Sequence, residues 1–257
     1  MASFLEQKFG LRGKVALVTG SSQGLGQGMA RALAQAGADV IVNGRVASKL
    51  APVVKEIEAF GGKATAIAAD LGNRADVQRL IEQAIAWRGH LDILVNNAGT
   101  IKRAPSADYT DADWDLVLNV NLNGVFTAAR AAGKHMIARG SGKIINIASL
   151  LTFFGGFTVP AYAASKGGVG QLTKALSNEW SSKGVQVNAI APGYMRTENT
   201  AALQADPVRS KEILSRIPAN RWGEPSDLEG AVVFLASSAS DYLSGHVMAV
   251  DGGWCGR

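Results

Sequence analysis

The 257-residue sequence has little cysteine and histidine and no long hydrophobic run. Its one cysteine, Cys255, excludes an intrachain disulfide and a cysteine-based zinc site. The three histidines are scattered without ligand spacing, so we predict no metal. The longest apolar runs, such as 144–147, are far too short to span a bilayer, and the first ten residues contain no secretory stretch. We therefore expect a cytoplasmic protein with no membrane partner.

Charge is also sparse, because Asp, Glu, Lys and Arg make up only 18% of the chain and the net charge is +5. The basic residues form no run and do not alternate with aromatic residues. This distribution argues against a nucleic-acid partner. The small excess of positive charge suits anionic small molecules.

Short segments rich in Val, Ile and Ala alternate with longer segments of helical periodicity. The expected strands are 15–18, 40–42, 64–68, 93–95, 143–147, 186–190 and 247–250, and the expected helices are 26–36, 47–60, 74–87, 113–136, 161–181 and 226–235. Hydrophobic strands joined by helices indicate an α/β fold in which a doubly wound parallel sheet is covered on both faces. No linker or repeat interrupts the pattern, so we predict one domain over 1–257. Residues 194–222, where Asp206-Pro207 and Ile217-Pro218 interrupt the periodicity, are expected to form a lid over the site.

The first predicted strand runs into a turn that contains Gly20, Gly24 and Gly26, and a helix follows. Such a turn lets the backbone approach a pyrophosphate, which the free N–H groups of the helix then bind. The spacing G-x-x-x-G-x-G departs from the usual G-x-G-x-x-G. A glycine turn that only packs a helix against a sheet would have the same sequence.

The second predicted strand ends at Asn43-Gly44-Arg45 and lacks an acidic residue to hold the adenosine ribose hydroxyls. Arg45 instead offers a planar, permanently charged group that suits a 2′-phosphate, with Ser21, Ser22 and Lys49 expected nearby. The sequence thus favours NADP over NAD as the cofactor. A solvated loop arginine is the alternative interpretation.

Four further motifs follow the predicted strands: Asn96-Asn97-Ala98-Gly99, then Ser149, then Tyr162-Ala163-Ala164-Ser165-Lys166, and finally Pro192-Gly193 with Thr197. In this order, together with the glycine turn, they resemble the short-chain dehydrogenase/reductase family over essentially the whole chain. The resemblance implies a single Rossmann-like domain with the strand order 3-2-1-4-5-6-7. It also implies a homotetramer that interconverts a secondary alcohol and a ketone with NAD or NADP.

The resemblance assigns roles to individual residues. The catalytic tetrad would be Asn121, Ser149, Tyr162 and Lys166. In it Tyr162 transfers the proton and Ser149 hydrogen-bonds the substrate oxygen. Lys166 holds the nicotinamide ribose and polarises Tyr162, and Asn121 anchors a water. The implied cofactor contacts are Gly20, Ser22, Gln23, Leu25, Arg45, Asp70, Leu71, Asn97, Ala98, Gly99, Tyr162, Lys166, Pro192, Gly193 and Thr197. Asp70 would equally serve to cap the following turn.

The pairing of Tyr162 with Lys166 has a physical rationale, because residues four apart on a helix lie one turn from each other. A free phenol, with a pKa near 10, is a poor base at neutral pH. A cation ~4 Å away supplies about 4 kcal/mol at an effective dielectric of ~20, enough to lower that pKa by ~2–3. A Tyr and a Lys at this spacing are otherwise usually just an amphipathic surface pair.

The C-terminal third, with Ile101-Lys102-Arg103, is similar to family members that act on sugar acids such as 2-deoxy-D-gluconate or 2-dehydro-3-deoxy-D-gluconate. Substrate contacts would then include Lys102 or Arg103, pairing with a carboxylate, beside Ser149 and Tyr162. Phe154 and Thr158 stand where those enzymes tend to have polar residues. The alternatives are therefore a gluconate 5-dehydrogenase, a 3-oxoacyl-[acyl-carrier-protein] reductase, or a non-enzymatic dinucleotide-binding module.

Overall fold

A computed structural model describes residues 3–256, which contain a seven-stranded sheet of order β3-β2-β1-β4-β5-β6-β7. Each neighbouring pair of strands is parallel. The strands are β1 (Val15–Val18), β2 (Asp39–Gly44), β3 (Lys63–Ala68), β4 (Ile93–Asn96), β5 (Gly142–Ile147), β6 (Val185–Pro192) and β7 (Val247–Val250). The predicted fold class and strand order are confirmed, and each strand contains the segment expected for it.

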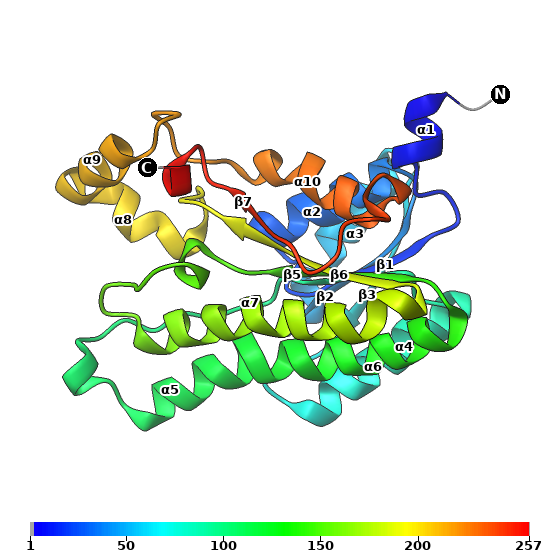
Figure 1. Cartoon of the computed structure of the whole chain (residues 1–257), viewed down its shortest axis with the longest axis horizontal. Helices are drawn as coiled ribbons and strands as arrows, with labels where there is room; N and C mark the ends of the chain where they lie inside the picture. Colours follow the sequence, from blue (N-terminus) through cyan, green and yellow to red (C-terminus); the bar gives the residue numbers. More distant parts are fainter. Residues whose placement is uncertain (1–2, 257) are drawn as a thin grey trace.

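Helices cover both faces of the sheet (Figure 1). One layer contains α2 (Gly24–Gln35), α3 (Ala51–Ala59) and α10 (Glu229–Ala236), and the other contains α4 (Arg74–Arg88), α6 (Gly124–Arg139) and α7 (Pro160–Trp180). Alternate residues of a strand point to opposite faces. In β1, Ala16 and Val18 therefore pack into the first layer's core, while Val15 and Leu17 pack into the second. This burial on both faces explains why every residue of β1 is hydrophobic.

The segment predicted as one helix over 113–136 is longer and is divided. It consists of α5 (Asp111–Leu118), a π-helical stretch at Asn119–Asn123 and α6. The helix begins two residues early because Thr110 caps it, its side chain accepting a hydrogen bond from the Asp113 N–H. A π-helical stretch inserts an extra residue into a helix and often marks a functional site. Periodicity alone does not reveal that insertion.

Residues 194–222 contain two helices that the interrupted periodicity concealed, α8 (Ala201–Ala205) and α9 (Pro207–Arg216). Asp206 caps α9 by accepting hydrogen bonds from the backbone N–H groups of Val208 and Arg209. Asp206-Pro207 therefore starts a helix rather than only breaking a pattern, because proline is well tolerated in a first helical turn. In Figure 1 both helices extend beyond the carboxyl ends of the strands.

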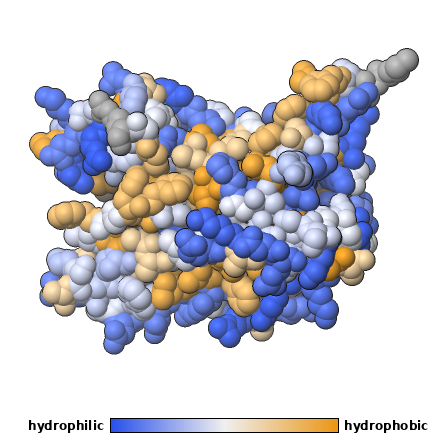
Figure 2. Space-filling view, in the orientation of Figure 1, coloured by the Kyte–Doolittle hydropathy of each residue, from blue (hydrophilic) through white to orange (hydrophobic). Residues whose placement is uncertain are grey.

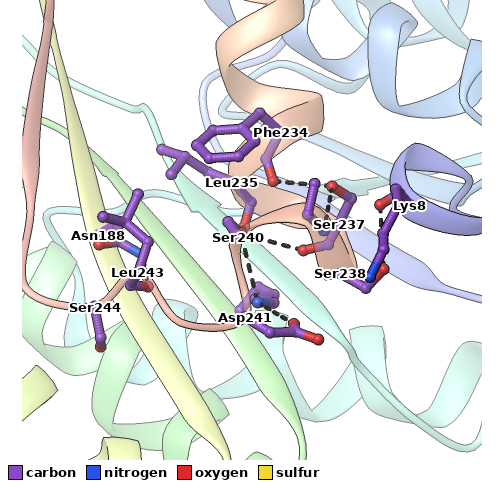
Figure 3. A network of polar contacts seen from close by, with 12 residues as sticks. Lys8, Asn188, Phe234, Leu235, Ser237, Ser238, Ser240, Asp241, Leu243 and Ser244 are labelled. Carbon is purple, nitrogen blue, oxygen red and sulfur yellow. Dashed lines mark hydrogen bonds and ion pairs between the residues drawn. The ribbon is translucent and has the colours of Figure 1, made fainter. Parts of the chain in front are cut away.

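A polar network fastens the N-terminal helix α1 (Phe4–Phe9), which was not predicted, to the turn after α10 (Figure 3). The Ser238 hydroxyl lies 3.3 Å from the carbonyl oxygen of Gln7 and 3.2 Å from that of Lys8. Ser240 donates to the carbonyl oxygen of Leu235 at 3.1 Å. This network lies at the end of the sheet opposite the cavity described below.

None of the helices within residues 3–256 has both the length and the hydrophobicity that a bilayer span requires. The same residues contain no group of three or more His, Cys, Asp and Glu side chains arranged to hold a metal ion. Cys255 is exposed and free.

Candidate active site

A cavity of about 1580 Å³ lies at the carboxyl ends of the strands, where ligands bind in doubly wound sheets. Its volume exceeds the ~300–1,000 Å³ of a typical single-ligand pocket, so it has room for a dinucleotide and a second molecule. Its lining comes from the glycine turn, the ends of β2, β4, β5 and β6, and the 194–222 segment. In Figure 2 the molecule is hollowed at the left, and hydrophobic side chains gather there.

Two glycines of the turn, Gly20 and Gly26, have no room for a side chain. Gly20 has φ +63°, and a Cβ on it would lie 2.7 Å from the Ala98 Cα. A Cβ on Gly26 would lie 2.4 Å from the Gly20 carbonyl oxygen. The Asn97 amide holds the turn by donating to the carbonyl oxygens of Thr19, at 2.9 Å, and Gly20, at 3.0 Å. The turn is thus fixed against the loop after β4, and the amino end of α2 lies at the cavity, where its N–H groups suit a diphosphate.

Arg45 lies exposed at the end of β2 and lines the cavity together with Ser22. Ser21 does not line it, since its buried hydroxyl donates to the Val18 carbonyl at 2.8 Å. Lys49 is exposed but is not among the lining residues. Asn43 braces the sheet by donating to the Ile67 carbonyl at 3.0 Å. Arg45 is therefore the cation that the β2 end presents to the cavity.

The other predicted cofactor residues also line the cavity: Gln23, Leu25, Asp70, Leu71, Asn97, Ala98, Gly99, Pro192, Gly193 and Thr197. Asp70 in addition caps its own turn, because its carboxylate accepts a hydrogen bond from the Gly72 N–H at 2.9 Å. The capping alternative considered for this residue is thus correct, and it does not remove Asp70 from the cavity.

The predicted catalytic side chains converge from β5 and α7. Ser149 follows β5 and caps the 3-10 turn Leu150–Thr152, accepting a hydrogen bond from the Leu151 N–H at 3.2 Å. Tyr162 and Lys166 lie one turn apart near the start of α7, and all three line the cavity. The Lys166 Nζ donates to the Ile147 carbonyl at 2.6 Å and lies 5.6 Å from the Tyr162 ring centroid.

Asn121 lies in the π-helical stretch and is fully buried. Its Oδ1 accepts from the Thr100 N–H at 2.8 Å, while its Nδ2 donates to the Thr100 carbonyl at 2.9 Å and to the Ser165 hydroxyl at 3.2 Å. Asn121 thus joins the loop after β4 to the helix that carries Tyr162 and Lys166. Its side chain does not line the cavity itself.

Burial dominates the titration of the Tyr162–Lys166 pair in the protein without cofactor. Burial raises the pKa of Tyr162, and the Ser149 hydrogen bond and the Arg103 charge only partly oppose that rise. Burial lowers the pKa of Lys166 to about 8. The Lys166 ammonium is directed at the Ile147 carbonyl. The isolated protein therefore presents a neutral phenol.

Of the two cations expected to meet a substrate, only Arg103 lines the cavity. It donates to the Asn199 carbonyl at 3.2 Å. Lys102 instead pairs with Asp113 at 3.1 Å, outside the cavity lining. Sequence reasoning missed Arg209 and Arg216 of α9, which also line the cavity. The spacing of the two arginines could have placed them on one helix, but Pro207 and Pro218 obscured the helical pattern.

The 194–222 segment leaves and rejoins the fold at one point. Met195 pairs with Gly223 in a parallel β-bridge, and the Gly223 N–H donates to the Tyr194 carbonyl at 2.9 Å. Just beyond this stem, the Gln23 amide of the glycine turn donates to the Glu198 carboxylate. The segment therefore contacts both the glycine turn and the loop that carries Arg103.

The fold and this cavity define an α/β protein in which a glycine turn lies beside a Ser–Tyr–Lys cluster that lines the cavity. Residues 14–208 match the short chain dehydrogenase family. The chain is 54% identical to a 2-dehydro-3-deoxy-D-gluconate 5-dehydrogenase of Pseudoalteromonas atlantica, over 98% of this chain and 99% of the relative. A protein of the same name from Escherichia coli K12 is 53% identical, over 97% and 98%. A gluconate 5-dehydrogenase from Burkholderia cenocepacia J2315, solved with NADP and tartrate, is 43% identical with a TM-score of 0.95, over 98% of this chain and 99% of that one.

The chain belongs to the short-chain dehydrogenase/reductase family. It is an NAD(P)-dependent oxidoreductase, as the family resemblance implied.

Proposed function

We propose that the protein interconverts a secondary alcohol and a ketone on a sugar acid, such as 2-dehydro-3-deoxy-D-gluconate or 2-deoxy-D-gluconate, with NADP as its preferred cofactor. The observation that carries the proposal is the convergence of Ser149, Tyr162 and Lys166 with the cation Arg103 in one cavity. The full-length similarity to sugar-acid dehydrogenases supports this substrate class.

The residues around the cradle fit the cofactor. The turn at Gly20 and Gly26 has space only for backbone, and it faces a helix amino end that favours a diphosphate. We assign the 2′-phosphate to Arg45, which has no acidic neighbour at the end of β2. The nicotinamide ring, when bound, accepts or supplies the hydride.

The catalytic residues act on the oxygen and its proton. In ketone reduction the neutral Tyr162 phenol donates its proton to the carbonyl oxygen, which the Ser149 hydroxyl orients. In alcohol oxidation the phenolate accepts that proton, and a cation close to its oxygen must stabilise it. Lys166 supplies this charge when its ammonium turns from the Ile147 carbonyl toward the ribose and phenol. Asn121 positions α7 through Ser165 and acts as a positioning residue.

We propose further that the 194–222 segment is a lid that excludes water from the reacting atoms. Its contacts through Glu198 and Asn199 to both walls of the cavity support this role. The homotetramer and the cytoplasmic location stay predictions.

A second candidate function arises from the cavity mouth. Phe154 and Phe157 line the cavity and are 42% and 90% exposed. Such an apolar wall suits a substrate with a hydrophobic chain, as in a 3-oxoacyl thioester.

The test is a screen of nicotinamide absorbance with NAD(H) and NADP(H). The panel contains 2-dehydro-3-deoxy-D-gluconate, 2-deoxy-D-gluconate, D-gluconate and a 3-oxoacyl thioester. We expect the highest kcat/KM for a sugar acid with NADP(H). Turnover confined to the thioester would refute the proposed substrate class and favour the second candidate.

A further inference from the structure

Arg216, the last residue of α9, is held in place by an aromatic stack. Its guanidinium carbon lies 4.2 Å from the Trp254 ring centroid. Trp254 is buried and packs against Tyr194 at 4.9 Å, and Tyr194 meets Trp222 edge-on at 5.6 Å. An arginine that stacks on an aromatic face is partly ordered before any ligand binds.

The stack belongs to a small hydrophobic cluster that reaches the catalytic loop. Leu150, Ile213, Ile217, Trp222 and Trp254 are its buried members. Leu150 directly follows Ser149, and Ile213 and Ile217 flank the last turn of α9. The position of Arg216 is thus fixed relative to the serine expected to hold the substrate oxygen.

Arg216 differs in its ionic partners from the other arginines of the 194–222 segment. Each of the other arginines of this region pairs with a carboxylate. Arg196 pairs with Glu224 at 3.0 Å, Arg209 with Glu212 at 2.7 Å and Arg221 with Asp227 at 2.6 Å. Among residues 3–256, Arg216 takes part in no ion pair.

Arg216 also faces open space on two sides. It lines the main cavity and, with Trp254, Tyr194 and the paired Arg209 and Glu212, a side cavity of about 330 Å³. An oriented guanidinium without a carboxylate partner, facing a ligand cavity, is suited to a planar anion, which it binds with two parallel hydrogen bonds.

We propose that Arg216 binds the carboxylate of the substrate and is a specificity-determining residue for acids. This inference rests on the proposed function, since it adds a contact to the same site. It places a substrate ligand on α9, in the cavity that Arg103 of the loop after β4 also lines. A bound acid then joins the 194–222 segment to the body of the enzyme.

The test measures binding of D-gluconate, tartrate and the uncharged polyol sorbitol to the NADP-loaded protein by calorimetry. The variants are Arg216→Gln, Arg216→Lys and, as a matched control, Arg196→Gln, which removes a solvent-exposed ion pair of the same segment. We expect Arg216→Gln to weaken gluconate and tartrate binding about 10- to 100-fold, the value of a charged hydrogen-bonded contact. Sorbitol and NADP binding and the melting temperature should stay unchanged.

Arg216→Lys keeps the charge but loses the planar two-pronged group, so we expect an intermediate affinity for acids. If Arg216→Gln fails to fold, the affinity of Arg216→Lys for acids tests the proposal instead. Unchanged gluconate affinity in either variant, or an equal loss of acid, polyol and cofactor binding, would overturn the proposal. If the protein binds acids through Arg216 but turns over none of them, the Arg216 site stands and the proposed function fails. If it turns them over independently of Arg216, only the Arg216 site fails.

Discussion

Replacing Lys166 by methionine measures what the buried ammonium costs the fold. Lys166 is only 4% exposed, and burial lowers the pKa of its ammonium from 10.5 to about 8. That difference corresponds to about 3 kcal/mol against burying the charged form. The hydrogen bond to the Ile147 carbonyl offsets ~1 kcal/mol of this penalty. Methionine has nearly the same length and no charge, so we expect Lys166→Met to stabilise the cofactor-free protein by about 2 kcal/mol at pH 7.

The pH dependence gives this prediction a distinct signature. Below pH 8 the lysine is charged in both folded and unfolded states, so the folded state bears the full penalty. Between the folded pKa of about 8 and the unfolded value of 10.5, the folded protein releases its proton and the penalty shrinks. The advantage of the methionine variant should therefore be largest at pH 6–7 and fade above pH 8.

The assay is thermal unfolding at one protein concentration, at pH 7 and at pH 9.5. A gain of ~2 kcal/mol corresponds to a rise in melting temperature of about 4–8 °C for a chain of this size. Lys174→Met is the matched control, since Lys174 lies exposed on the same helix. Catalytic turnover should be lost in the Lys166 variant alone. A lower melting temperature at pH 7, or a gain that does not depend on pH, would refute the reasoning.

Three further predictions concern catalysis and the cofactor. Tyr162→Phe should lower kcat at least ~10²-fold while NADP still binds, because the phenol carries the proton; near-normal turnover would point to another acid. Arg45→Asp should shift the ratio of kcat/KM for NADP over NAD about 10- to 100-fold toward NAD, through loss of the phosphate contact; an unchanged ratio would contradict the assignment. Glu198→Gln keeps the hydrogen bond with Gln23 but removes a negative charge from the diphosphate end of the cavity. It should tighten NADP binding about fivefold at low salt, by ~1 kcal/mol, and the gain should fall in high salt. An NADP affinity equal to that of the unaltered protein would rule this out.

Most of the fold follows from local pattern. Strands buried on both faces are rich in hydrophobic residues, so β1 and the Ile-rich β5 were evident from composition, and parallel pairing then required helices between them. The two helices of the 194–222 segment were not evident. α9 is only ten residues long, and the prolines at its start and just after its end obscured its amphipathic pattern.

The candidate site was predictable where a residue's place follows from the end of a strand or the turn of a helix. Ser149, Tyr162 and Lys166 are of this kind. The side-chain partners were not predictable, because they depend on contacts between distant segments. Lys102 forms an ion pair with Asp113, and the Lys166 ammonium donates a hydrogen bond to the Ile147 carbonyl. The pKa values depend on these contacts and on burial, and neither can be derived from spacing.

The stem formed by Met195 and Gly223 has a consequence for engineering and evolution. Because the segment enters and leaves the domain through adjacent, hydrogen-bonded backbone, its ends stay together whatever lies between them. The entropy of closing a loop grows only slowly with its length. A relative's stretch that keeps the hydrophobic residues at 213, 217 and 222, which pack on Leu150 and Trp254, should therefore fit this stem. We expect it to transfer the relative's preference among acids and to leave the sheet intact.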